Sequence, residues 1–163
     1  MQRRAFVILG AAFLAGCAAG TPGSVRLRPG TTLYIVRHGD REGEDLTAKG
    51  RQRAQALVGA LEGMALDAIY APGIKRNLDT ASPIAAARGL EVMRRPQENP
   101  TARLAREAAG KAALWVGNKG NITAIWDGLG LPDPAPLNYG DLAIVRADAT
   151  GGVTVERRVF GPK

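Results

Sequence analysis

The sequence holds few of the residue types that most often carry chemistry. It has one cysteine and one histidine, and aromatic residues make up 5% of its 163 positions. A single cysteine excludes an internal disulfide and Cys-rich zinc sites, and a single histidine excludes histidine-pair metal motifs and any mechanism that needs two histidines. We therefore expect no metal and no cofactor, and any histidine chemistry must use His38.

The N-terminus has the layout of an exported lipoprotein. Arg3 and Arg4 precede an apolar run at residues 5–15, which is too short to span a membrane, and small residues then lead to Cys17. This ending resembles the lipobox of bacterial lipoproteins, in which the cysteine is acylated; the alternative is an ordinary signal peptide with an incidental cysteine. We expect a signal peptide at 1–16, lipid attachment at Cys17, and a linker through residue 30. Ala18, in place of an aspartate, favours an outer-membrane anchor that faces the periplasm.

The protein carries a basic charge that is spread along the chain. The net charge is +7, from 22 basic and 15 acidic residues, and the leader contributes two of the basic ones, so that the domain itself is nearer +5. No run of Lys or Arg exceeds two residues. Such a balance fits a solvated basic surface, an anionic membrane or an anionic small ligand, and export to the envelope argues against nucleic acid.

Residues 31–163 alternate between strand-like and helix-like segments, which predicts one α/β domain. Thr47 and Asn121 are expected to cap the first and last helices, and Gly89 and Gly110 to end the second and third. The pattern predicts a three-layer fold with a mostly parallel central sheet, helices on both faces and room for an antiparallel edge strand. The expected strands are 31–36, 66–70, 90–93, 112–116, 141–146 and 153–158, and the expected helices are 46–61, 77–88, 101–109 and 122–129.

Cations and hydrogen-bond donors follow three of these strands. The first strand ends at Arg37, His38 and Gly39, Lys75 and Arg76 come shortly after the second, and 118–119 (Asn-Lys) follow the strand at 112–116. Ligands of open α/β sheets bind beyond the carboxyl ends of the strands, so these side chains predict an anion site that suits phosphate. Between arginines, His38 is expected to be a neutral imidazole, which is a nucleophile.

Several segments, in order over residues 31–161, resemble the histidine phosphatase superfamily, which has the phosphoglycerate mutase-like fold. The resemblance implies that His38 becomes a phosphohistidine, with Arg37, Gly39, Arg76 and Asn118 around the phosphate. The segments are LYIVRHGD at 33–40 for the R-H-G signature, LTAKG at 46–50 for L-T-x-x-G, IYAPGIKRNLDTA at 69–81 for S-P-L-x-R-x-x-x-T-A, VGN at 116–118 for V-G-H, and NYGDL at 138–142 for the final strand entry.

The departure from that family pattern is Asn118, which stands where the second catalytic histidine is expected. Asparagine donates a neutral hydrogen bond but supplies no charge and no transferable proton. Lys119 restores the charge if its side chain points inward; otherwise it is a solvent-facing lysine. Candidates for the acid that protonates the leaving group are Glu98 and Asp40, with Glu42 and Glu44 nearby, and each also fits an ordinary surface carboxylate.

Two functions follow from these residues. The first is a phosphate-monoester hydrolase that acts through a phosphohistidine at His38, slowed by Asn118, on small phosphoesters in the cell envelope. The second is a catalytically degenerate envelope lipoprotein that binds a phosphorylated or anionic ligand, or a protein partner, without turnover. Both require Arg37, His38, Arg76 and Asn118 to converge on one site.

Overall fold

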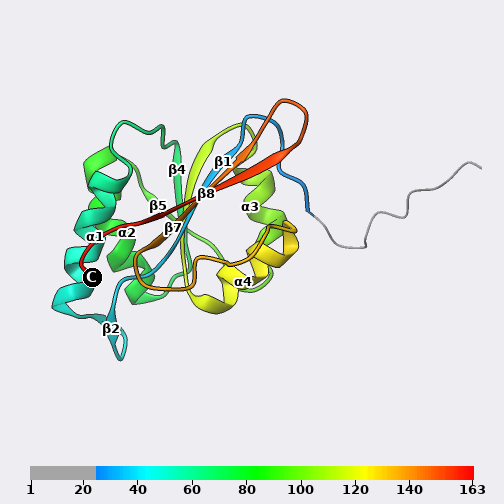
Figure 1. The fold of residues 1–163 in the computed structure, drawn as a ribbon. Helices are drawn as coiled ribbons and strands as arrows, with labels where there is room; N and C mark the ends of the chain where they lie inside the picture. Colours follow the sequence, from blue (N-terminus) through cyan, green and yellow to red (C-terminus); the bar gives the residue numbers. More distant parts are fainter. Residues whose placement is uncertain (1–24) are drawn as a thin grey trace, which may run out of the picture.

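The computed structural model describes residues 25–163 and contains one six-stranded sheet with the strand order β5-β4-β6-β1-β7-β8 (Figure 1). Cys17 and the predicted signal peptide lie outside the described residues. The strands of the sheet are β1 (Thr32–Arg37), β4 (Ala68–Ala71), β5 (Val92–Arg94), β6 (Ala112–Gly117), β7 (Asp141–Ala147) and β8 (Val153–Val159). The helices are α1 (Ala48–Ala60), α2 (Lys75–Arg88), α3 (Thr101–Glu107) and α4 (Lys119–Gly128), and a small hairpin consists of β2 (Arg41–Glu42) and β3 (Asp45–Leu46).

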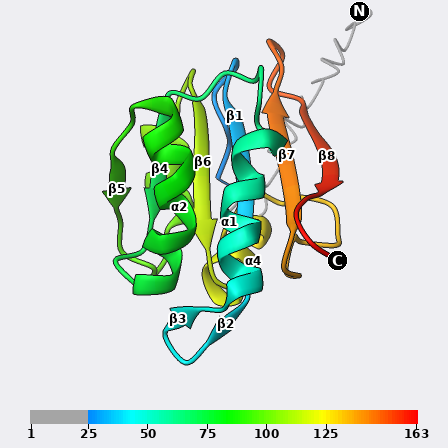
Figure 2. The ribbon, with the colours of Figure 1, turned by 90° about the vertical axis from the view of Figure 1, so that its left-hand side faces the viewer.

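The sheet is mostly parallel, as the alternation of segments predicts. β1 pairs in parallel with β6, and β4 pairs in parallel with both β6 and β5. β7 runs antiparallel to β1, and β8 runs antiparallel to β7, so the antiparallel part lies at one edge. Figure 2 shows α1 and α2 on one face of the sheet, with α4 behind it. The three-layer, phosphoglycerate mutase-like fold predicted from the sequence is confirmed.

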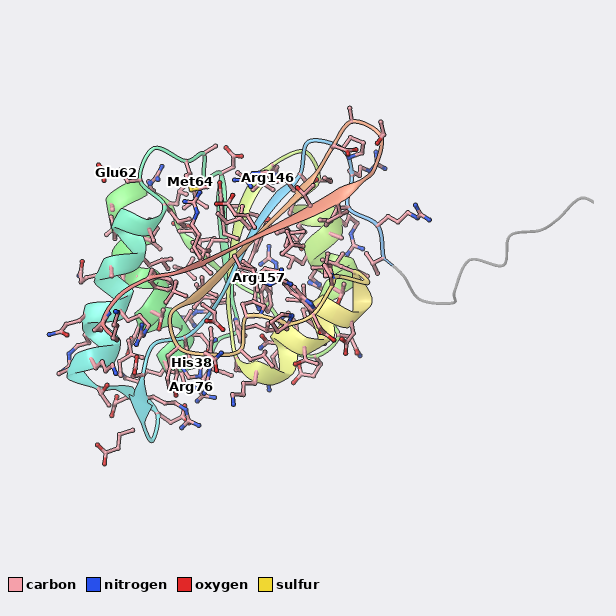
Figure 3. All side chains as sticks on the ribbon, viewed as in Figure 1. His38, Glu62, Met64, Arg76, Arg146 and Arg157 are labelled. Atoms are coloured by element: carbon pink, nitrogen blue, oxygen red, sulfur yellow. The ribbon has the colours of Figure 1, made fainter. Side chains whose placement is uncertain are left out.

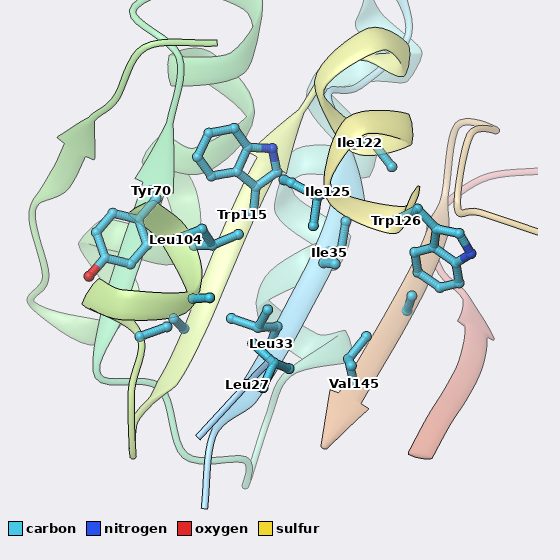
Figure 4. Close-up of a cluster of buried hydrophobic side chains, with 14 of the residues drawn as sticks. Leu27, Leu33, Ile35, Tyr70, Leu104, Trp115, Ile122, Ile125, Trp126 and Val145 are labelled. Atoms are coloured by element: carbon cyan, nitrogen blue, oxygen red, sulfur yellow. The ribbon is translucent and has the colours of Figure 1, made fainter. Parts of the chain in front are cut away.

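Alternate residues of the central strands fill two separate cores. On β1, Leu33 and Ile35 pack with α3 and α4, whereas Tyr34 and Val36 pack with α1 and α2. This alternation is the period-2 geometry of a strand that is buried on both faces. Figure 4 shows the core on the α3–α4 side, where the two tryptophans of the sequence are both buried.

Leu27 belongs to the same core, although the sequence placed it in the linker. It is 5% exposed, and the neighbouring Val25 N–H donates to Gly128 O at 2.8 Å. An apolar residue of this size is buried because its removal from water is favourable. The part of the predicted linker that the structure describes, residues 25–30, therefore packs against the domain.

Two of the four predicted helix ends are correct; α3 ends with Ala108 as its cap, two residues before the predicted Gly110. Thr47 caps α1, with its hydroxyl accepting from Gly50 N–H at 3.1 Å, and Gly89 ends α2 in the left-handed conformation with φ 63°. The predicted cap of the last helix is wrong: α4 begins at Lys119 and is capped by Asn118, while Asn121 occupies the third helical position. None of the helices in residues 25–163 is long and apolar enough to cross a membrane.

Candidate active site

The carboxyl edge of the sheet brings the predicted site residues together. β1 and β6 are in register from Thr32 opposite Ala112 to Arg37 opposite Gly117, and His38 N–H donates to Gly117 O at 2.9 Å. His38 and Asn118 therefore leave the sheet side by side. Arg76 lies in the first turn of α2, after β4, and Figure 3 shows it beside His38 at one end of the molecule.

His38 is almost completely buried, with 2% of its surface exposed. Its Nδ1 lies 2.8 Å from Gly39 O, and because a carbonyl oxygen only accepts, Nδ1 carries the proton. Nε2 is then the acceptor, and Arg76 Nε–H donates to it at 3.3 Å. This hydrogen-bond pattern assigns the tautomer and leaves the lone pair of Nε2 facing the arginine.

The environment of His38 lowers its pKa to about 4, which keeps the imidazole neutral at physiological pH. Burial is the main cause; the hydrogen bond to Gly39 acts in the opposite direction, and the charges of Arg37 and Arg76 lower the pKa further. The neutral imidazole expected from the sequence agrees with this direction. The sequence argument used only the arginines, whereas desolvation is the larger effect.

Arg76 already holds a carboxylate. Its Nη1 donates to both carboxylate oxygens of Glu44, at 2.9 and 2.8 Å, while its Nε contacts His38. Glu44 lies in the turn between β2 and β3, and its side chain is 66% exposed against 14% for Arg76. An exposed surface carboxylate therefore occupies a face of the guanidinium that suits a phosphate oxygen.

Arg37 is held by Tyr139, a residue that the sequence argument did not single out. The guanidinium lies 3.9 Å from the centre of the Tyr139 ring, and its Nη2 donates to the tyrosine hydroxyl at 3.1 Å. Its Nη1 donates to Leu137 O at 3.1 Å, and its buried Nε has no hydrogen-bond partner among the described residues. The Tyr139 ring also lies 5.8 Å from the His38 ring, so one aromatic side chain contacts both residues.

The motif residues interlock behind the site. A Cβ on Gly39 would lie 2.7 Å from Gly50 O, and one on Gly50 would lie 2.0 Å from Asp40 O, so the R-H-G and L-T-x-x-G glycines permit a close backbone approach. Gly39 N–H donates to Thr80 Oγ1 at 2.9 Å, and this hydroxyl donates to Arg76 O at 2.7 Å. Gly39 was expected to serve the phosphate; its amide instead fixes α2 against β1.

These motifs and this fold agree with comparisons to known proteins. Residues 33–97 match the family model of the histidine phosphatase superfamily, branch 1. This segment is similar to the histidine phosphatase superfamily, and the domain shares the fold of solved phosphatase structures. The resemblance found in the sequence motifs is thereby confirmed. No curated protein matches the chain.

Three solved structures illustrate the shared fold. A phosphoserine phosphatase from Entamoeba histolytica, in complex with 3-phosphoglyceric acid, is 16% identical, with a TM-score of 0.59 over 82% of this chain and 98% of that one. A mycobacterial glucosyl-3-phosphoglycerate phosphatase with inorganic phosphate is 16% identical, with a TM-score of 0.56 over 82% and 98%. The protein histidine phosphatase SixA, complexed with tungstate, is 15% identical, with a TM-score of 0.54 over 78% and 96%.

Asn118, where the sequence resemblance leads us to expect a second histidine, works as a helix cap. Its Oδ1 accepts from Asn121 N–H at 3.2 Å, and the Asn121 side chain accepts in return from Asn118 N–H at 3.0 Å. The Asn118 Nδ2 donates to Gln97 Oε1 at 3.2 Å. Asn121 also accepts from Trp115 Nε1 at 3.0 Å, which ties the cap to the core. Both polar ends of the Asn118 side chain are thus engaged by the protein itself.

Asp40 is unsuited to the role of general acid that the sequence left open for it. Its carboxylate pairs with Arg53 Nε at 2.7 Å, and Arg53 is only 4% exposed. Burial raises the pKa of Asp40, but the hydrogen bond and charge of Arg53 outweigh it and lower the pKa overall. Arg53 also donates to Phe160 O at 2.9 Å, so this ion pair joins the R-H-G loop to the C-terminal segment.

The other charged candidates lie around the site in different settings. Glu98 is exposed and lines a hollow of about 90 Å³ with Tyr70 and Trp115, and His38 is not part of that lining. Glu42 is exposed on β2, and among these carboxylates it is Glu44 that reaches Arg76.

The lysines of the predicted anion site lie away from the imidazole. Lys75 is paired with Asp45 at 2.9 Å and Asp79 at 2.6 Å, so its charge is not free for a ligand. Lys119 is exposed on the first turn of α4. Across residues 25–163, no three His, Cys, Asp or Glu side chains gather where they could hold a metal ion.

Proposed function

We propose that this protein is a phosphate-monoester hydrolase that acts through a phosphohistidine at Nε2 of His38. The observation that carries the proposal is the imidazole itself, which is neutral, buried and fixed by Gly39 so that its unprotonated Nε2 faces Arg76. A neutral imidazole nitrogen beside a guanidinium is a nucleophile placed next to an anion ligand. The phosphatase structures that share the fold support this chemistry.

The reaction follows from these contacts. A phosphate group displaces Glu44 from Arg76 and is neutralised by Arg76 and Arg37. Arg76 Nε–H turns from Nε2 to the phosphate, which frees the Nε2 lone pair to attack phosphorus. The ester P–O bond breaks, and the leaving oxygen departs with its electron pair and takes a proton from water. The proton on Nδ1 stays, and Gly39 O stabilises the positive charge that forms on the ring. Water then cleaves the P–N bond and releases phosphate.

The structure supports a strong dependence on the leaving group. Asp40 is held as an anion by Arg53, and Asn118 has no transferable proton. An aryl phosphate, whose leaving oxygen needs no protonation, is therefore expected to react faster than an alkyl phosphate. The missing donor at Asn118 lowers the rate by on the order of 10²–10³ relative to a site with a full set of donors.

The experiment compares three proteins, namely the wild type, His38→Ala and Asn118→His. Each is assayed for hydrolysis of an aryl phosphate and for an acid-labile, base-stable phosphoryl label on the chain. Hydrolysis and labelling are expected in the wild type and must both disappear in His38→Ala. Hydrolysis that survives in His38→Ala shows that another group is the nucleophile and rejects the proposal.

A second function, binding without turnover, is favoured by the two contacts that occupy the site. Asn118 is committed to the helix cap and Glu44 covers Arg76. If phosphate binds the wild type in calorimetry and aryl phosphate is not hydrolysed, while Asn118→His gains hydrolysis, the protein is a degenerate member that binds a phosphorylated or anionic ligand.

We further propose that the protein is lipid-anchored at Cys17 in the cell envelope and acts on small phosphoesters in the periplasm. The support is the sequence pattern that ends at Cys17 and the absence of aspartate at position 18. In cells grown with a labelled fatty acid, the wild type is expected to incorporate the label and Cys17→Ser is expected to lose it. If Cys17→Ser keeps the label, the lipid is attached elsewhere.

A further inference from the structure

A group of arginines whose side chains have no hydrogen-bond partner within residues 25–163 lies away from His38, at the other end of the sheet. Of the fifteen arginines in residues 25–163, ten donate side-chain hydrogen bonds within the described structure. Four of the other five are Arg26 and Arg28, before β1, and Arg103 and Arg106, on α3. The partnerless arginines are thus concentrated in one region of the fold.

Three of these arginines surround a single hollow, which we call the arginine hollow. Arg26, Arg28 and Arg106 line a space of about 690 Å³ whose other lining residues are small or apolar, with no acidic residue among them. Glu107, the neighbour of Arg106, turns to Arg95 and pairs with it at 2.7 Å. Like charges gathered without counter-charges repel each other, so this arrangement favours an anion in the hollow.

The arginine hollow lies where the described chain begins. Val25, the first described residue, is part of its lining, and its N–H is fixed to Gly128 O on α4. Figure 1 shows this N-terminal end of β1 near α3, while Figure 3 shows His38 and Arg76 at the opposite end. Cys17 precedes Val25 by eight residues, a span of at most about 28 Å, so a lipid on Cys17 keeps the hollow within reach of the bilayer.

We infer that the arginine hollow binds the phosphate groups of anionic phospholipids and seats the domain on the membrane with His38 facing away from it. Guanidinium groups match phosphate oxygens in charge and geometry, and basic residues beside an anionic leaflet are drawn to it. The small apolar lining leaves room for a headgroup between the arginines. This surface is separate from the phosphate site at His38, and the inference holds whether or not that site turns over.

The test measures partition of the full chain, carrying Cys17→Ser to remove acylation, onto two kinds of vesicle. One is phosphatidylcholine alone, and the other also contains phosphatidylglycerol at a fixed fraction. Any insertion of the apolar leader adds to partition onto both kinds of vesicle. The ratio of the two partition coefficients therefore measures the preference for the anionic lipid. The test variant is Arg26→Gln/Arg28→Gln/Arg106→Gln. The control variant, Arg94→Gln/Lys119→Gln/Lys163→Gln, removes the same charge from exposed positions outside the hollow.

Each arginine at an anionic surface raises the partition coefficient by a factor of about five. Removing three of them is therefore expected to make the preference for phosphatidylglycerol vesicles roughly 100-fold weaker in the test variant. The control variant is expected to keep most of it, and added salt is expected to weaken the wild-type preference. The inference is overturned if the wild type shows no preference for the anionic vesicles, or if both variants lose it equally. Thermal unfolding of both variants checks that each is folded.

Discussion

Replacing Asn118 with histidine separates the two roles that this position can have. The side chain caps α4 through Asn121 N–H at 3.2 Å, and histidine is a poor replacement for an asparagine cap. Loss of such a cap lowers the free energy of unfolding by about 1 kcal/mol. In return, the imidazole restores a hydrogen-bond donor beside His38, where one preorganised donor is worth on the order of 10²–10³ in rate. Asn118→His is therefore expected to be less stable and more active.

Two matched variants separate the loss of the helix cap from the gain of a hydrogen-bond donor. Their stability is measured by urea unfolding and their activity by aryl phosphate hydrolysis. Asn118→Ala removes the cap without adding a donor, so it is expected to lose about the same 1 kcal/mol with no gain in rate. Asn118→Ser keeps a capping oxygen and is expected to keep most of the stability. If Asn118→His hydrolyses the substrate no faster than Asn118→Ala, residue 118 does not reach the phosphate, and our reading of this position is wrong.

Three further predictions concern the groups that surround the phosphate position. His38 has a pKa of about 4 in the fold against 6.5 when unperturbed, so its contribution to stability is full above pH 6.5 and is lost as the pH falls towards 4. This amounts to roughly 3 kcal/mol, and urea unfolding of His38→Gln should lack that part of the pH dependence. Glu44→Gln removes the carboxylate that competes with phosphate for Arg76. Because such an exposed ion pair contributes at most about 1 kcal/mol, the phosphate affinity measured by calorimetry should rise up to fivefold at low salt. The rise should be smaller at high salt, which screens the pair. Tyr139→Leu removes the ring under Arg37 and is expected to weaken phosphate binding roughly threefold to tenfold. Tyr139→Phe keeps the stacked ring, so its phosphate affinity should stay near that of the wild type. Equal losses in both variants would show that the hydroxyl, not the ring, holds Arg37.

The order of the elements could be predicted from the sequence because their patterns are local. The continuous apolar run of β1, the cap at Thr47 and the left-handed Gly89 each depend on a few neighbouring residues. Leu27 shows where this reasoning fails, because its short segment has no period of its own and is buried only by contact with the distant core. The cap of α4 was misplaced by three residues because Asn118 and Asn121 both have the side chain that a cap requires, and they act as a reciprocal pair.

The site was predicted as a set of residues, but their partners were not. Arg37, His38 and Arg76 follow strands or open a helix, and the parallel register brings such positions to one edge. Tyr139 lies 102 residues from Arg37 in sequence, and its place in the NYGDL segment does not indicate that its ring lies under this guanidinium. Thr80 did have a signal, since it is the threonine of the second-arginine motif, and the structure gives the reason: its hydroxyl links Gly39 to Arg76.

Asn118 also bears on how the site functions with a single histidine. A side chain at this position either caps α4 or serves the phosphate, because Oδ1 and Nδ2 are both directed to protein partners, Asn121 and Gln97. Arg37 and the neutral His38 do not depend on that choice, since their fixing contacts come from Leu137 O, Tyr139 and Gly39 O. The contacts that fix Arg37 and His38 are thus independent of residue 118. Under the proposed function, such a site is expected to bind and attack phosphate, and without a proton donor its turnover is expected to depend on how readily the leaving group departs.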